Sequence, residues 1–380
     1  MWSSGSADSV LDGGRIQLAR QRRSMTQKEL AKRLGVTPRT VSRYEREDSA
    51  SRSVSKALSE VLGFPESYFF TPVPDDSGVE RVRFRSAVSS SQQSRNAASA
   101  SLIHGGAIDD WILDRLTIPS LDLPDLEGAT PEEAAHELRY SWALGDGPVP
   151  NMIQLLESRG IHVYGLPQIS RSVDAFSTWY KQRPLVFLGM QKTPERSRFD
   201  AAHELGHLTM HRDGSNLSPS EIEKQADQFA SEFLTPKTTI RGAVSFNPGV
   251  QELLRFRASF RVSAIAAARA VHAATMSSEW HHRQLMIELS RRGYRTSEPG
   301  GMTQYERSRI FDVLFSDDFP KSTTVNALAR QTALPPDDVH ALTLGTELRA
   351  VPSLEQESAS TRMGAQPSEH SPAPTLRLVP

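Results

Sequence analysis

His203, Glu204 and His207 are the residues whose types and spacing indicate chemistry most directly. On a helix, two histidines four positions apart lie one turn above each other on the same face, so both imidazoles can bind one metal ion. Glu204 then lies beside that ion, where it can take a proton from a metal-activated water molecule and pass it to a leaving amine. The spacing therefore predicts a metal centre able to hydrolyse an amide bond.

The plainer alternative for this helix is that both histidines are ordinary hydrogen-bonded residues. The neighbouring side chains favour a cleft instead, because four apolar residues surround the motif: Ala201, Ala202, Leu205 and Leu208. The chain contains no cysteine, so thiolate ligands are excluded and a zinc ion must be held by His, Asp or Glu.

The residues directly after the motif do not supply a third ligand. Met210 and Asp213 stand where the metzincin pattern requires Gly and His, so that class of site is excluded. His211 continues the spacing of four, but on a straight helix its Cα lies ~12 Å from that of His203. We therefore expect His211 to be structural.

The next predicted helix, SPSEIEKQADQFASEFLTP, offers Glu223 as the third ligand. Glu223 lies at the edge of an apolar stripe, from which its carboxylate can reach a buried ion, whereas Glu221 points to water. Asp227 follows one turn later and can hydrogen-bond a ligating histidine. The alternative is that Glu223 is an ordinary exposed glutamate. The stripe consists of Ile222, Ala226, Phe229, Ala230 and Phe233.

The N-terminal part of the chain is basic. From Gly14 to Arg46 there are ten Lys or Arg and two acidic residues, although the whole chain has a net charge of −1. Such a block indicates a polyanionic partner for this part alone.

The same segment has the pattern of two short helices joined by a tight turn. Thr26 and Glu29 form a capping box, Gly35 provides the turn, and Thr37-Pro38 begins a second helix that runs to about Arg46. Arginines occupy the outer face of that second helix, as a DNA-reading helix requires. A helical module that docks onto protein, with solvated arginines, is the alternative.

The string RQRRSMTQKELAKRLGVTPRTVSRYE resembles the Cro and phage-repressor (Xre-type) helix-turn-helix family over residues 13–70. The resemblance implies that this part binds double-stranded operator DNA, with Gln27 on the backbone or a base and Arg39, Thr40 and Arg43 facing the major groove. One departure is EREDSASRS after the second helix, where family members often carry Gly and Pro. The expected DNA-binding residues are Gln27, Thr37, Arg39, Thr40, Ser42 and Arg43.

A second resemblance, to the ImmA/IrrE metallopeptidases, extends over residues 119–236. It is carried by PEEAAHELRYSWALGDGPVPNMIQLLESRGIHV, DAFSTW, RPLVFL, RFDAAHELGHLTMH and EKQADQFASEFLTP. The resemblance implies a gluzincin-like Zn²⁺ site with His203, His207 and Glu223 as ligands and Glu204 as catalytic base. It also implies a protein substrate, typically a repressor.

The predicted fold class is a mainly α helix-turn-helix domain, an α+β gluzincin-like metallopeptidase domain and a helical C-terminal region. Three β segments are expected within IHVYGL, DAFSTW and PLVFLGM, and a short strand in VERVRFR. No internal repeat is evident, and FRVSAIAAARAV is either a further helix-turn-helix-like element or a lid. The expected boundaries are 1–72 for the DNA-binding domain, 73–118 for a linker and connecting helix, 119–245 for the peptidase domain, 246–346 for the helical region and 347–380 for a disordered tail.

The N-terminus lacks the features of a signal peptide and no long uncharged apolar run occurs, so we expect a cytoplasmic protein with no membrane partner. Two hypotheses follow. The first is a regulator that binds an operator, as a possible homodimer, and cleaves a repressor, a partner or its own helix-turn-helix region on a signal. The second is a transcription factor whose zinc domain is a non-catalytic sensor or scaffold.

Overall fold

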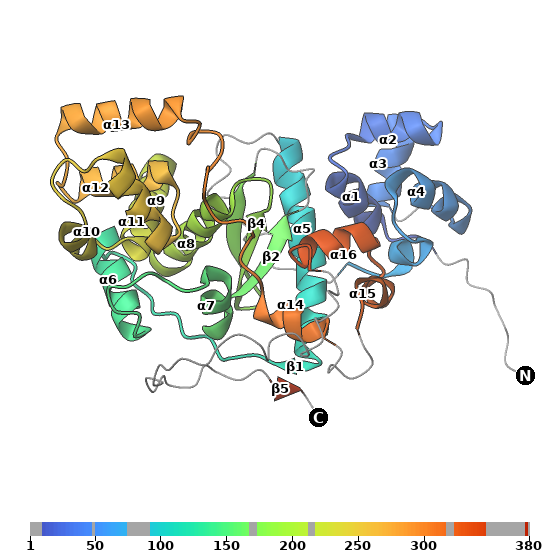
Figure 1. The fold of residues 1–380 in the computed structure, drawn as a ribbon. Coiled ribbons are helices and arrows are strands. Elements are labelled where there is room, and N and C mark those ends of the chain that lie inside the picture. The colour runs from blue at the N-terminus through green and yellow to red at the C-terminus, as the bar shows by residue number, and fades with distance from the viewer. Residues whose placement is uncertain are drawn as a thin grey trace, which may run out of the picture.

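The computed structural model describes residues 10–47, 50–73, 92–166, 173–211, 217–316 and 323–346, together with the backbone of 377–378 (Figure 1). The strand predicted at 79–85 and nearly all of the predicted tail lie outside the described residues. Within the described residues, no helix combines the length and the hydropathy that crossing a bilayer requires.

The N-terminal part is a compact group of short helices. The capping box of Thr26 and Glu29 is present, and α2 ends at Gly35 in the left-handed conformation, where glycine is the least strained residue. The hydroxyl of Thr37 caps α3, which begins with Pro38 as predicted. The elements are α1 Gly13–Arg22, α2 Gln27–Leu34, α3 Pro38–Arg46, η1 Arg52–Val54, α4 Ser55–Leu62 and η2 Glu66–Phe70.

A long helix, α5 (Gln92–Leu113), stands between the helix-turn-helix part and the sheet (Figure 1). Its Ser- and Ala-rich first half is helical and becomes buried from Ala97 onward. Two glycines let the second half of α5 lie close to the sheet, because a Cβ at Gly105 or Gly106 would come within 3 Å of an aromatic ring of the sheet. Asp109 joins α5 to the sheet by accepting hydrogen bonds from Tyr164 and Arg183.

The three predicted strands form one mixed sheet in the order β2-β4-β3. β2 is parallel to β4, and β3 is antiparallel to it. Because side chains alternate between the two faces of a strand, one face packs on α8 and its neighbours while the other packs on α5. The strands are β2 His162–Leu166, β3 Ala175–Tyr180 and β4 Arg183–Gly189; the short β1 Leu116–Thr117 pairs with β5 Arg377–Leu378.

The remaining helices pack on the sheet or on α8, α9 and one another. Side chains from 250–273 belong to the same hydrophobic core as those of α8 and α9, so FRVSAIAAARAV, which joins the end of α11 to α12, lies within that core. These helices are α6 Pro131–Ser141, α7 Met152–Ser158, α8 Pro194–Met210, α9 Pro219–Leu234, α10 Lys237–Ala243, α11 Val250–Phe260, α12 Ala264–Ala273, α13 Glu279–Arg291, α14 Arg309–Leu314, α15 Val325–Thr332 and α16 Pro336–Leu342.

Candidate metal centre and nucleic-acid interface

Helix α8 carries the histidine motif near its centre. The helix begins with Pro194 after Thr193 and packs against β3 and β4. The Nε2 atoms of His203 and His207 lie 3.0 Å apart, which is the convergence expected from a spacing of four. Both imidazoles are mostly buried, so the motif lies within the fold and not on an open surface.

Glu223 of α9 joins the two histidines. Its Oε2 lies 3.3 Å from Nε2 of His203, and its Oε1 lies 3.5 Å from Nε2 of His207. One ligand atom from each of the three residues falls within 4.8 Å of the others. In the part of the chain that the structure describes, this is the one such group of three or more potential ligands.

Two residues flank this group. Oδ1 of Asp227 lies 2.9 Å from Nδ1 of His203, which orients the ring and directs Nε2 toward the centre of the group. Burial lowers the pKa of His203, but the hydrogen bonds to Asp227 and Glu223 outweigh it and raise the pKa to about 10. His211, the residue after α8, is outside the group; its Nδ1 lies 3.2 Å from Nδ1 of His207, and its Nε2 lies 2.9 Å from the side-chain oxygen of Gln225.

Glu204 is buried beside the histidines and forms a contact that the sequence did not reveal. Ser177 of β3 donates a hydrogen bond of 2.7 Å from its hydroxyl to Oε2 of Glu204. Burial raises the pKa of Glu204 to about 7, against the lowering effects of the positive charge of His203 and the Ser177 bond. Ser177 lies in the predicted strand DAFSTW, but nothing local in the sequence shows that this strand packs on α8.

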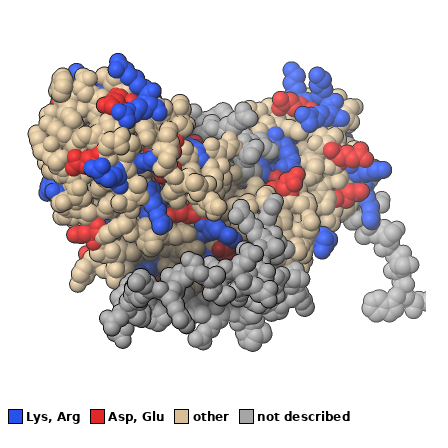
Figure 2. All heavy atoms as spheres, viewed as in Figure 1, with Lys and Arg blue, Asp and Glu red and all other residues tan. Residues whose placement is uncertain are grey.

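The predicted DNA-binding residues lie on α3 and at the start of α2. Arg39 and Arg43 are exposed on the outer face of α3, while Thr40 and Ser42 are half-buried. The Thr37 side chain is engaged as the cap of α3. The amide nitrogen of Gln27 donates to Glu45 at 2.7 Å, so this side chain is held within the domain. Figure 2 shows further Lys and Arg side chains over α2, where Lys28, Lys32 and Arg33 are exposed.

Two family models match the chain. A helix-turn-helix model matches residues 16–69, and a peptidase model described as the IrrE N-terminal-like domain matches residues 156–272. The chain carries an Xre-type helix-turn-helix domain and an IrrE N-terminal-like domain. The second match covers the whole histidine motif and Glu223 and extends into α12. No curated protein matches the chain.

The donor set of the IrrE N-terminal-like domain fits a zinc ion. Once the Nε2 proton of His203 is released, its Nδ1–H can donate to Asp227 while its Nε2 presents a lone pair toward Nε2 of His207 and the Glu223 carboxylate. Oε1 of Glu223 is buried and has no hydrogen-bond partner. A cation between these atoms would satisfy both the nitrogens and the carboxylate, and two imidazoles with one carboxylate suit zinc.

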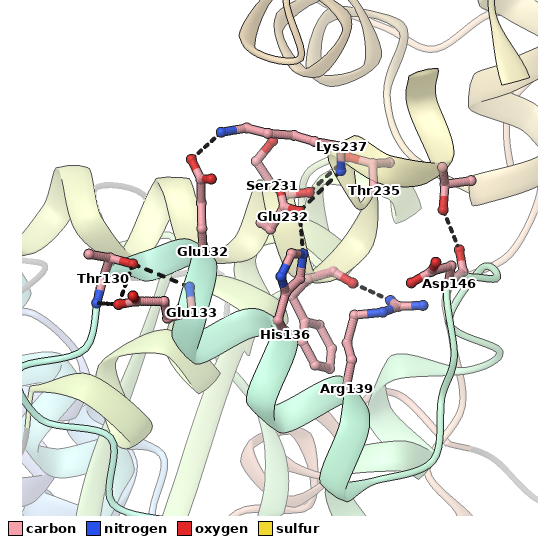
Figure 3. Close-up of polar contacts among 12 residues, drawn as sticks. Thr130, Glu132, Glu133, His136, Arg139, Asp146, Ser231, Glu232, Thr235 and Lys237 are labelled. Atoms are coloured by element: carbon pink, nitrogen blue, oxygen red, sulfur yellow. Dashed lines mark hydrogen bonds and ion pairs between the residues drawn. The ribbon is translucent and has the colours of Figure 1, made fainter. Parts of the chain in front are cut away.

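The IrrE N-terminal-like domain holds α9, and with it Glu223, by contacts to α6 (Figure 3). Arg139 donates to the backbone carbonyl of Phe233, and Nε2 of His136 lies 2.9 Å from the buried carboxylate of Glu232. Glu232 also accepts a hydrogen bond from the backbone amide of Lys237. These contacts anchor the end of α9 remote from Glu223, so the ligand-bearing turn has a fixed direction relative to α8.

Proposed function

We propose that this protein is a DNA-binding regulator whose second domain is a zinc-dependent endopeptidase that acts on a protein partner, such as a repressor. In this proposal His203, His207 and Glu223 bind the metal, Asp227 orients His203, and Glu204 is the catalytic base. The observation that carries it is the convergence of two imidazoles and a carboxylate from separate helices, with a buried glutamate beside them.

Zinc bound by these three residues supplies a Lewis acid that polarises a peptide carbonyl and makes water more acidic. The chain's own groups handle the protons. A carboxylate oxygen of Glu204 takes a proton from the attacking water molecule and returns it to the leaving amine. Ser177 holds Oε2 of Glu204 in position by a hydrogen bond. Burial of Glu204, which is 2% exposed, keeps bulk water from competing for this carboxylate.

The peptidase half is tested by comparing wild type with Glu204→Gln. Zinc content is measured by mass spectrometry, and cleavage is measured on a library of unstructured peptides. We expect equal zinc content and a loss of cleavage of at least ~100-fold, because proton transfer is removed while the ligands remain. Equal zinc content with no cleavage by either protein, and identical repression of a reporter by both, would favour a sensor or scaffold.

In the DNA-binding half, Arg39, Thr40, Ser42 and Arg43 are proposed to face the major groove, with Gln27 and Thr37 near the phosphates. Exposure of Arg39 and Arg43 on the outer face of α3 supports this assignment. We expect Arg43→Ala to weaken operator binding by roughly 1–3 kcal/mol, because an arginine bound to a guanine edge contributes about this much. Gel-shift titration measures the change, with Lys56→Ala on α4 as an exposed control. Equal affinity of Arg43→Ala and wild type would contradict the assignment.

A further inference from the structure

Helices α15 and α16 repeat the backbone geometry of α2 and α3. The first helix of each pair has eight residues, and a threonine, Thr26 or Thr324, caps it by accepting a hydrogen bond from the backbone three positions on. Each ends in the left-handed conformation, at Gly35 with φ 69° and at Ala333 with φ 55°. The second helix then begins with a proline, Pro38 or Pro336. The two pairs therefore share the cap and length of the first helix, the left-handed turn, and the proline that begins the second helix.

The buried positions of the two pairs also correspond. Three apolar residues of α2 and α3 are buried, and the residues at the same places in α15 and α16 have the same types and are buried as well. The matched pairs are Leu30 with Leu328, Ala31 with Ala329 and Val41 with Val339. Caps, turn and core together define residues 324–342 as a second helix-turn-helix unit, although few other residues in it repeat.

The outer face of this second unit has lost the basic residues that DNA requires. Asp337 and Asp338 stand at the positions of Arg39 and Thr40, and Ala341 stands at the position of Arg43. Carboxylates at the reading positions repel phosphates and cannot donate hydrogen bonds to guanine. The second unit is therefore unsuited to reading DNA.

Asp338 on this face of α16 is buried in the protein, whereas Asp337 is exposed. Oδ1 of Asp338 accepts hydrogen bonds from Arg22 at 2.7 Å and from Arg23 at 2.9 Å, both at the end of α1 in the DNA-binding domain. On the same helix, the backbone carbonyl of Ala341 packs so closely on Gly165 of β2 that no side chain would fit there. One short helix thus touches both the DNA-binding domain and the sheet.

The buried guanidinium of Arg22 depends on Asp338 as its counter-charge. Its side chain is fully buried, and its Nε and Nη1 atoms have no hydrogen-bond partner. Among the described residues, the carboxylate of Asp338 is the one acceptor that the guanidinium of Arg22 has. A buried cation without a counter-charge is strongly unfavourable, so loss of Asp338 would drive Arg22 toward water and open this contact.

We propose that residues 324–342 are a second helix-turn-helix unit that binds protein in place of DNA, and that its reading helix fixes the DNA-binding domain to the sheet through Asp338, Arg22 and Arg23. The partner of this surface is the chain's own α1. In this way the position of α3 relative to the metal group becomes fixed.

The absence of cysteine allows a direct test by spin labelling of the full chain. Labels at Glu60→Cys on α4 and Arg291→Cys on α13, both exposed, report the distance between the two parts by pulsed electron resonance. We expect one narrow distance peak in the otherwise unmodified chain, a broader peak in Asp338→Ala, in which the packing of α1 on α5 remains, and no change in Asp337→Ala, an exposed neighbour.

The double variant Asp338→Ala/Arg22→Met separates this proposal from general misfolding. An apolar side chain in place of Arg22 removes the unpaired buried cation, so the narrow peak is expected to return. An unchanged peak in Asp338→Ala would overturn the proposal, as would a peak that stays broad in the double variant.

A second measurement tests the loss of DNA reading by this unit. Titration with a short duplex of random sequence at low salt should show that Arg39→Ala/Arg43→Ala lowers affinity at least ~10-fold although α15 and α16 are intact. Asp337→Ala should bind at least as tightly as wild type. If the double arginine variant bound the duplex as tightly as wild type, and a further substitution in α16 removed that binding, the second unit would be shown to read DNA.

Discussion

Two glutamates in this protein, Glu157 and Glu204, share one electrostatic property but occupy different environments. Both are almost fully buried, and burial raises the pKa of each to about 7. Glu157 at the end of α7 accepts hydrogen bonds from the Ser308 hydroxyl and from two backbone amides at the start of α14. Glu204 accepts a side-chain bond from Ser177 and faces three potential metal ligands.

The difference shows that a perturbed pKa does not by itself identify a catalytic group. Glu157 ties α14 to α7 and has its oxygens occupied by donors of the protein, which is a structural arrangement. Glu204 retains bonding capacity toward a site where other ligands converge. The placement of the donors, and not the pKa, separates the two roles.

The largest expected effect is on folding stability. Glu157→Ala leaves the Ser308 hydroxyl and two amides of α14 without an acceptor, so we expect the free energy of unfolding to fall by roughly 2–5 kcal/mol. Glu204→Ala should change it by less than about 1 kcal/mol, because one serine alone loses its partner. Urea unfolding of both variants measures the difference, and equal losses would contradict the comparison.

The second-largest expected effect is a change in folding stability with pH. The pKa of Glu157 rises from 4.5 in the unfolded chain to about 7 in the fold, so the folded state binds this proton more tightly. Its contribution to stability is complete below pH 4.5 and is lost as the pH rises through about 7, a total of up to about 3 kcal/mol.

Glu157→Gln cannot ionise, so its unfolding free energy should fall less steeply between pH 5 and 7 than that of wild type. Thermal unfolding at a series of pH values tests this expectation. A slope identical to that of wild type would show that Glu157 ionises normally in the fold.

Metal affinity should respond to the orientation of His203. Asp227→Asn replaces the carboxylate that faces Nδ1 of His203, and such partners contribute about 10–100-fold in metal affinity. The side chain of Asp227 is 65% exposed, so we expect the lower end, near tenfold. Competition with a chromophoric zinc chelator measures the affinity, with Gln228→Ala as an exposed control on the same helix. Wild-type affinity in Asp227→Asn would exclude an orienting role.

The smallest effect concerns Ser177. Its hydrogen bond lowers the pKa of Glu204, so Ser177→Ala should raise that pKa and shift the acidic limb of peptide cleavage to higher pH by less than about one unit. The pH profile of cleavage measures the shift, with Thr178→Ser as a conservative control on the same strand. A shift toward lower pH would contradict the assigned direction of the hydrogen bond.

Local signals predicted much of this molecule from sequence. Capping residues such as Thr26, Thr130 and Ser218 define where helices begin, since a side-chain oxygen that satisfies a free amide acts within a few residues. The apolar stripe of α9 likewise placed Glu223 at its edge, and the structure finds that residue next to His203 and His207.

Features that depend on contacts distant in sequence escaped prediction. Ser177 meets Glu204 only because β3 packs on α8. The first half of α5 has a polar composition, yet Ala100 is buried against Leu18 of α1. The second helix-turn-helix unit shares its buried core residues with the first unit but few other residues, so its geometry reveals the likeness and its sequence does not.

The packing of α1 on α5 has a practical consequence. Leu18 of α1 lies against Ala100 and Ile103 of α5, so the two regions share buried apolar surface. A fragment that starts at residue 92 would expose that surface to water and tend to aggregate. A chain nicked between residues 73 and 92 should instead stay together as a two-piece complex, separable by denaturant but not by dilution.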